Sequence, residues 1–129
     1  MANQFVVQLK NEPGAMATLA EALAARGVDL RAIGGGSMGD SGHVILTTAD
    51  DPATKSILEE DGYDFIEGDS ILAEVDDRPG GMARLSRALA DAGVNIYGHL
   101  FLGRWGDRAM FAFVVDKPEI ARPILERKA

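Results

Sequence analysis

Residues 11–30 read NEPGAMATLAEALAARGVDL and residues 77–96 read DRPGGMARLSRALADAGVNI, and ten of the aligned positions are identical. The two segments lie 66 positions apart. The same offset places Asp50-Asp51-Pro52 on Asp116-Lys117-Pro118 and Glu60 on Glu126, so we expect the duplication to continue without a gap. This self-similarity predicts one small domain used twice, with repeat 1 in residues 1–68 and repeat 2 in residues 69–129.

The composition excludes several kinds of site and partner. The net charge is −7 and the sequence has no basic run, which argues against nucleic-acid binding through phosphate contacts. The absence of Cys excludes disulfides and thiolate chemistry. No signal-like start and no apolar run of about 18 residues is present, so we expect a cytoplasmic protein without a membrane partner.

The hydrophobic pattern predicts a β-α-β-β-α-β order in repeat 1, and therefore an α+β fold with antiparallel sheets and helices on one face. The expected elements are strand 5–9, a helix from Pro13 to Gly27, strand 28–38, turn 39–42, strand 43–48, a helix from about 51 to 62 capped by Asp50 or Asp51, and strand 63–66. Repeat 2 is expected to contain strand 71–75, helix 80–92, strand 94–103, turn 104–107, strand 108–115 and helix 118–128. It ends without a last strand of its own.

The segment 63–67 is separated from the strand at 71–75 by only a few residues. Such a short link is typical of a hairpin. We therefore expect residues 63–67 to pair antiparallel with residues 71–75, filling the empty place in repeat 2 or bridging both repeats.

These motifs make the chain similar to a tandem pair of ACT domains, small ferredoxin-like modules that sense ligands. The family motif is N-x-P-G at a helix start with G-V-N-I after the helix. It stands here as Asn11-Glu12-Pro13-Gly14 with residues 27–30, and as Asp77-Arg78-Pro79-Gly80 with residues 93–96. The resemblance implies non-catalytic, allosteric binding of an amino acid between two domains, in a homodimer or within one chain.

Physical chemistry supports such a site at each helix start. The first backbone N–H groups of a helix are free to bind a carboxylate, and glycine lets a ligand approach the backbone. An Asn side chain offers an acceptor for an ammonium and a donor for a carboxylate. The predicted ligand-binding residues are Asn11, Glu12, Pro13, Gly14, Ala15, Met16, Asp29, Leu30, Asp77, Arg78, Pro79, Gly80, Gly81, Met82, Asn95 and Ile96.

The resemblance also implies which residues share a site. One site would hold Asn11 with Asn95, and its counterpart would hold Asp77 with Asp29. Two carboxylates repel each other and a ligand carboxylate, so we expect the second site to be silent or to prefer a cation. A His found four residues before the Pro in the family is absent, which argues against a serine-type ligand.

Other features have simpler interpretations. Residues 34–39 match G-x-G-x-x-G, but a strand follows where a dinucleotide site has a helix. His43 and His99 lack the spacing of metal ligands, and no catalytic triad motif is present, so we expect no metal, no cofactor and no enzyme activity. An alternative function is a protein-binding assembly or regulatory subunit of a metabolic enzyme, with vestigial pockets.

Three residues are singled out for their position. Met16 and Met82 lie on the same helix face as core leucines, so core packing is favoured over a role in a ligand pocket. Trp105 is expected at the tip of a hairpin turn, where it is either an ordinary packed or exposed turn residue or part of a partner surface. Pro123 should kink the last helix or mark where its regular part begins.

Overall fold

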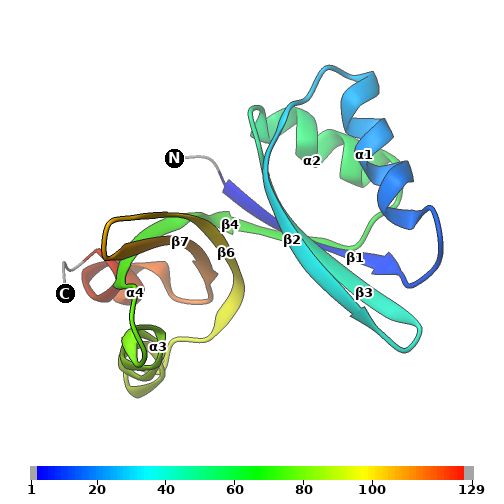
Figure 1. Cartoon of the computed structure of the whole chain (residues 1–129). Helices are drawn as coiled ribbons and strands as arrows, with labels where there is room; N and C mark the ends of the chain where they lie inside the picture. Colours follow the sequence, from blue (N-terminus) through cyan, green and yellow to red (C-terminus); the bar gives the residue numbers. More distant parts are fainter. Residues whose placement is uncertain (1–2, 127–129) are drawn as a thin grey trace. The chain divides into compact units, whose positions relative to one another are not determined.

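The computed structural model of the chain describes residues 3–126. These residues form two compact units that divide between Glu67 and Gly68 (Figure 1). Among the described helices, none is long and apolar enough to cross a membrane.

The first unit is a four-stranded antiparallel sheet covered on one face by two helices. Its elements are β1 (Asn3–Lys10), α1 (Ala15–Ala25), β2 (Leu30–Met38), β3 (Ser41–Thr48), α2 (Asp51–Glu60) and β4 (Phe65–Asp69), and the strand order is β2-β3-β1-β4. Both helices lie on the same side of the sheet in Figure 1. Phe5 and Leu46 from the strands and Leu19 and Leu58 from the helices are fully buried in one core, which explains the helical spacing of apolar residues in the sequence.

The second unit repeats this design with three strands. Its elements are β5 (Ile71–Asp76), α3 (Gly81–Asp91), β6 (Ile96–Trp105), β7 (Arg108–Val115) and α4 (Pro118–Leu125), in the strand order β5-β7-β6. Ile71, Phe113, Leu89 and Leu125 belong to its separate core. Pro123 lies inside α4, which begins at Pro118 and continues past it.

Glycines stop the first helix of each unit, as the sequence predicts. Gly27 and Gly93 have φ angles of 72° and 75°. The N–H of Val28 donates to the carbonyl of Leu23, and that of Gly27 to the carbonyl of Ala24. This pattern is a Schellman motif, which requires a left-handed residue after the helix.

The helix starts differ from the prediction by one or two residues. The N-cap residues of α1 and α3 are Gly14 and Gly80, with φ angles of 89° and 93°. Pro13 and Pro79 therefore precede the N-cap, and neither occupies the first helical position. The left-handed conformation explains why glycine follows proline in both repeats.

The expected hairpin between residues 63–67 and 71–75 does not form. β4 lies beside β1 in the first sheet, where the N–H of Gln8 donates to the carbonyl of Asp64 at 2.9 Å. Ser70 alone separates β4 from β5. A single residue cannot reverse the chain, because the shortest common hairpin loop has two. β4 thus completes its own repeat, and the prediction was wrong.

The expectation of a gap-free duplication was also wrong. The pairing of β6 with β7 shifts between Phe101 and Gly103, which leaves Leu102 as an extra residue in a β-bulge. The pairing of β2 with β3 has no shift at this place. Beyond Leu102 the two repeats are therefore related by an offset of 67.

The new offset changes which residues correspond. The N–H of Asn11 donates to the carbonyl of Asp40, and the N–H of Asp77 donates to that of Asp107, so Asp40 matches Asp107. The α2 N-cap Asp50, whose carboxylate accepts from the N–H of Ala53, likewise matches Lys117.

Trp105 is the last residue of β6, and the turn consists of residues 106–107. The expected turn at 104–107 was too long. The Trp105 side chain is 61% exposed.

Candidate functional site

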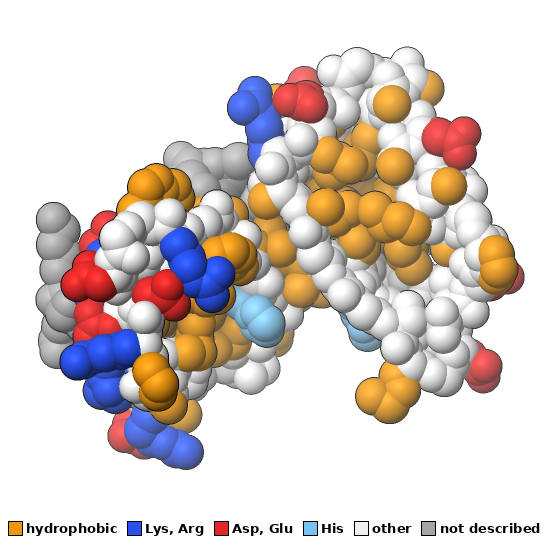
Figure 2. All heavy atoms as spheres, viewed as in Figure 1, with side chains coloured by type: hydrophobic (Ala, Val, Ile, Leu, Met, Phe, Trp, Pro, Cys, Tyr) orange, Lys and Arg blue, Asp and Glu red, His pale blue; other side chains and the backbone are white. Residues whose placement is uncertain are grey.

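A groove lies along the loop that joins β1 to α1 in the first unit. We call it the Asn11 groove; it has a volume of about 280 Å³ and is lined by this loop, by α1 and by β2 and β3. Met16 and Ile33 contribute apolar side chains, which are 41% and 43% exposed. In Figure 2, hydrophobic side chains gather between α1 and β2. The groove is therefore apolar on one side and lined by the polar loop on the other.

Asn11 ties the loop to the β2–β3 turn. Its side-chain N–H donates to the carbonyl of Gly39 at 2.9 Å, and its backbone N–H donates to the carbonyl of Asp40 at 3.2 Å. This pairing fixes the amide orientation, because only the NH₂ end of the side chain can donate to a carbonyl. The side-chain oxygen remains available as an acceptor.

The start of α1 is open. No side chain caps it, and no acidic residue lies in its first turn. Within the described residues, the N–H groups of Met16 and Ala17 have no hydrogen-bond partner, and the space beside Gly14 holds no atom within 4 Å of an added Cβ. Such N–H groups favour an anion, aided by the helix dipole.

The corresponding Asp77 groove of the second unit is lined by residues of the β5–α3 loop together with Met82, Arg104 and Phe111, and has a volume of about 330 Å³. Asp77 accepts from Nε of Arg104 at 2.8 Å. Arg104 also lies over the Phe101 ring, 4.8 Å from its centroid. Asp77 has the position in repeat 2 that Asn11 has in repeat 1. Its carboxylate is already neutralised by Arg104 of the same unit.

Arginines also surround the neighbouring Asp76. Arg78 and Arg84 approach its carboxylate to 3.2 and 3.5 Å, and Arg108 pairs with it as well. Arg84 reaches Gly80, where an added Cβ would lie 3.0 Å from Nη1. Figure 2 shows basic and acidic side chains side by side on this unit. The start of α3 is therefore bordered by an internal ion-pair network.

The residues after the helices lie at the far end of α1 and α3 from these grooves. Asp29 forms an exposed ion pair with Arg31 at 3.3 Å. The backbone N–H of Asn95 donates to the Asp116 carboxylate at 2.9 Å. Within one unit, neither Asp29 nor Asn95 lines the groove at the opposite helix end.

The remaining predicted residues divide between groove and core. Glu12, Ala15 and Met16 line the Asn11 groove, and Arg78, Pro79 and Met82 line the Asp77 groove. Leu30 and Ile96 pack against the cores, as does Met82. Gly81 is buried against the carbonyl of Asp76.

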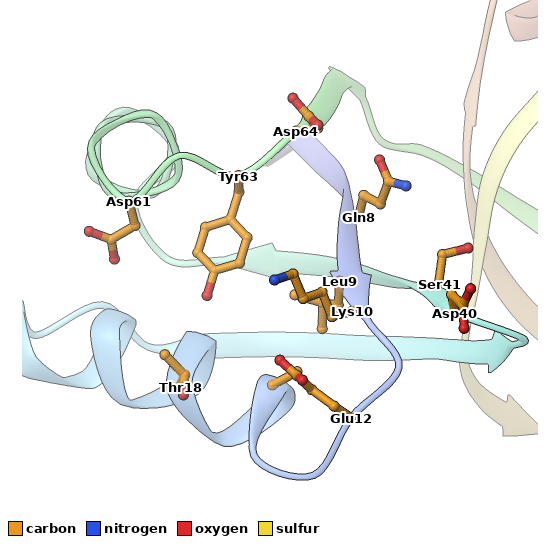
Figure 3. A pocket seen from close by; sticks show the side chains of 11 residues that line it. Gln8, Leu9, Lys10, Glu12, Thr18, Asp40, Ser41, Asp61, Tyr63 and Asp64 are labelled. Atoms are coloured by element: carbon orange, nitrogen blue, oxygen red, sulfur yellow. The ribbon is translucent and has the colours of Figure 1, made fainter.

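A second pocket of the first unit contains residues that sequence analysis missed. We call it the Tyr63 pocket; it has a volume of about 500 Å³ and lies between the end of β1, α1 and the α2–β4 link. Figure 3 shows Tyr63 and Lys10 on the side of β1 that faces Thr18 of α1 and Glu12 of the β1–α1 loop. Burial, and secondarily the charge of Asp61, raise the pKa of Tyr63 above its usual value. The only sequence signal was an aromatic residue directly after the helix-stopping Gly62.

No cluster of three or more potential metal ligands is found among residues 3–126.

The architecture is shared with solved structures of low sequence identity. The protein BT0572 from Bacteroides thetaiotaomicron has a TM-score of 0.73 at 19% identity, covering 97% of this chain and 86% of that chain. The regulatory subunit of aspartate kinase from Thermus flavus has a TM-score of 0.65 at 19% identity, covering 98% and 92%. The chain has the tandem ACT fold.

The ligand-free regulatory subunit of aspartate kinase from Thermus thermophilus is similar too, with a TM-score of 0.60 at 22% identity over 97% of this chain and 91% of that chain. No protein-family model matches the sequence, and no curated protein matches it significantly. At these identities the tandem ACT assignment describes the fold.

Proposed function

We propose that this tandem ACT protein is a non-catalytic regulator that binds a free amino acid in the Asn11 groove. The observation that carries the proposal is the open start of α1, where free N–H groups lie beside a neutral amide. The ligand carboxylate accepts from the N–H groups of Met16 and Ala17. The side-chain oxygen of Asn11 accepts from the ligand ammonium, and Met16 and Ile33 contact its apolar part.

The second groove is proposed to be silent toward amino acids. The start of α3 is as free of caps as that of α1, but a ligand ammonium there would have to displace Arg104 from Asp77 or the arginines from Asp76. Exchanging one ion pair for another gains little net energy at exposed positions. We further propose, from the family pattern, that Asn95 completes the first site, within the chain or from the second copy of a homodimer, while Asp29 does not bind.

The regulated partner is proposed to be a metabolic enzyme. Two of the structures with this fold are regulatory subunits of aspartate kinase. A chain of this architecture would act by associating with an enzyme, or with itself, when the ligand binds. We also propose that the protein acts in the cytoplasm.

The proposal is tested by thermal unfolding with each common amino acid at millimolar concentration. A ligand at 100 times its dissociation constant adds about 2.7 kcal/mol to the free energy of unfolding. Asn11→Ala should abolish the stabilisation, and Asn95→Ala should weaken it. Arg87→Ala is the matched control, because Arg87 forms only an exposed pair with Asp91 on α3. No stabilisation by any amino acid, or an unchanged effect in Asn11→Ala, would refute the site.

A second candidate function is a protein-binding subunit, favoured by the aromatic residues of β6. This strand lies at an edge of the second sheet, and Tyr97, Phe101 and Trp105 are 48%, 49% and 61% exposed. Exposed aromatic residues are enriched in protein interfaces. Trp105→Ala should then weaken association with the enzyme and leave amino-acid binding unchanged, which separates the two candidates.

A further inference from the structure

The Tyr63 pocket contains the basic side chain of Lys10, which pairs with no other group among the described residues. Among residues 3–126, Lys10 is the one Lys or Arg side chain without an ion pair or hydrogen bond. This is unexpected in a unit rich in carboxylates. An ammonium that lines a pocket without a protein partner is available to an anionic group.

The acidic side chains of the same pocket are available too. Glu12, Asp40, Asp61 and Asp64 line it, and within the described part of the chain none of these carboxylates accepts a hydrogen bond or forms an ion pair. In Figure 3 the Glu12 carboxylate and the Lys10 ammonium border the same space from opposite sides. The pocket thus presents separated opposite charges that do not satisfy one another.

Tyr63 and Leu9 supply an apolar wall between these charges. The Tyr63 ring is half-buried and belongs to the edge of the first core, which fixes its position. The Tyr63 and Thr18 hydroxyls have no partner within residues 3–126 and add hydrogen-bonding capacity. A ring face beside a carboxylate also favours an ammonium group.

The second repeat lacks this combination. Asp76 and Arg84 stand where repeat 1 has Lys10 and Thr18, and these two residues pair with each other. No aromatic residue follows α4 in the described chain. The arrangement is therefore specific to repeat 1 and does not follow from the fold alone.

We propose that the Tyr63 pocket is a second binding site, separate from the Asn11 groove, for a small zwitterion with an apolar side chain. Lys10 binds its carboxylate, Glu12 and Asp61 bind its ammonium, and the Tyr63 ring packs on its apolar part. The two sites share the loop after β1, because Leu9, Lys10, Glu12 and Ala15 line both.

The test uses the ring NMR signals of Tyr63 in the full chain carrying Tyr97→Phe, which leaves one tyrosine. The probes are the common L-amino acids, with acetate and methylammonium as single-charge controls. At least one amino acid with an apolar side chain should shift the Tyr63 signals in a saturable manner, and neither control should do so. Lys10→Gln should weaken this binding about tenfold or more, as expected for loss of a charged hydrogen-bond partner.

Asn11→Ala separates this proposal from the proposed function. It should leave the Tyr63 response within about twofold of the wild-type affinity while removing the response of the Met16 and Ala17 amides. The second site is overturned if no amino acid shifts the Tyr63 signals, if acetate alone reproduces the shift, or if Lys10→Gln binds as the wild type does. Unchanged amide spectra of Lys10→Gln away from the pocket verify that the variant is folded.

Discussion

The two repeats share a backbone design and differ in how their charges are paired. Residues 1–67 contain four Lys and Arg against eleven Asp and Glu, whereas residues 68–129 contain nine of each. The balanced repeat uses its arginines to neutralise Asp76 and Asp77 at the start of α3. Neither α1 nor α3 has a side-chain cap at its start, but in the acidic repeat the start of α1 lies next to a neutral Asn11 and an unpaired Lys10. A duplicated domain can thus keep its fold while the charged side chains of one copy pair with each other and the polar groups of the other copy remain available to a ligand.

The extra residue in β6 contributes to this difference. Because Leu102 bulges out, Arg104 takes the register position that Ser37 has in repeat 1. From there its Nε reaches Asp77. One inserted residue therefore brings a cation to the second groove.

The largest expected effect comes from Gly81→Ala, which introduces the residue that repeat 1 has at this position, Ala15. The new Cβ would lie 2.2 Å from the backbone oxygen of Asp76 and 2.9 Å from Cγ1 of Val75. Overpacking of this kind costs about 1–3 kcal/mol, measured as a lower free energy of unfolding in urea. Ala15→Gly is the matched control and should cost about 1 kcal/mol or less. Equal stability of Gly81→Ala and wild type would show that the repeats are interchangeable here.

Asn11→Asp gives the Asn11 groove the carboxylate that Asp77 provides in the Asp77 groove. The carboxylate cannot donate to the Gly39 carbonyl, so about 1 kcal/mol of stability should be lost. Binding of an amino acid should be lost as well, because the new charge repels the ligand carboxylate. Calorimetric titration checks the binding. Retained affinity would remove Asn11 from the site.

The reverse conversion tests whether the second groove can be opened. The triple variant Asp77→Asn, Arg84→Thr and Arg104→Ser gives repeat 2 the residues of repeat 1. Its stability should fall by less than about 1 kcal/mol, since the pairs removed are largely exposed. The Met82 and Ala83 amides should then respond to amino acids in ¹H–¹⁵N spectra. A response already present in the wild type would contradict the contrast between the repeats.

The smallest effect concerns Tyr63, which has no counterpart among the described residues of repeat 2. Because its pKa is raised on folding, it contributes stability that is fully present below the unfolded value of 10.0 and is lost as pH rises through the folded pKa. In Tyr97→Phe, phenolate absorbance should titrate above the ordinary tyrosine range. Asp61→Asn should lower that midpoint by removing one of its two causes. A midpoint at or below 10.0 would show that the ring is fully hydrated.

The fold was largely predictable from the sequence, because its signals are local. The Pro-Gly and Gly-Val pairs mark the ends of α1 and α3, and the apolar spacing identifies the faces that form the two cores. The partner of β4 was missed because a short link was interpreted as a turn, although Ser70 alone cannot reverse the chain. Leu102 was missed because Pro52 and Pro118 align at an offset of 66 despite different positions in α2 and α4.

The candidate site was predictable only in part. The loops at Asn11 and Asp77 were located by their motif, and both line grooves. The pairing of Asp77 with Arg104 and the isolation of Lys10 depend on which side chains meet in three dimensions. The Tyr63 pocket joins β1, α1 and the α2–β4 link, which no sequence pattern connects.

The most direct test of the central claim is a ¹H–¹⁵N titration of the wild-type protein with each common amino acid. The account predicts that the amides of Met16 and Ala17, at the start of α1, shift with at least one amino acid, while those of Met82 and Ala83 do not. Shifts at Met82 and Ala83, or no shift at Met16 and Ala17 with any amino acid, would contradict it.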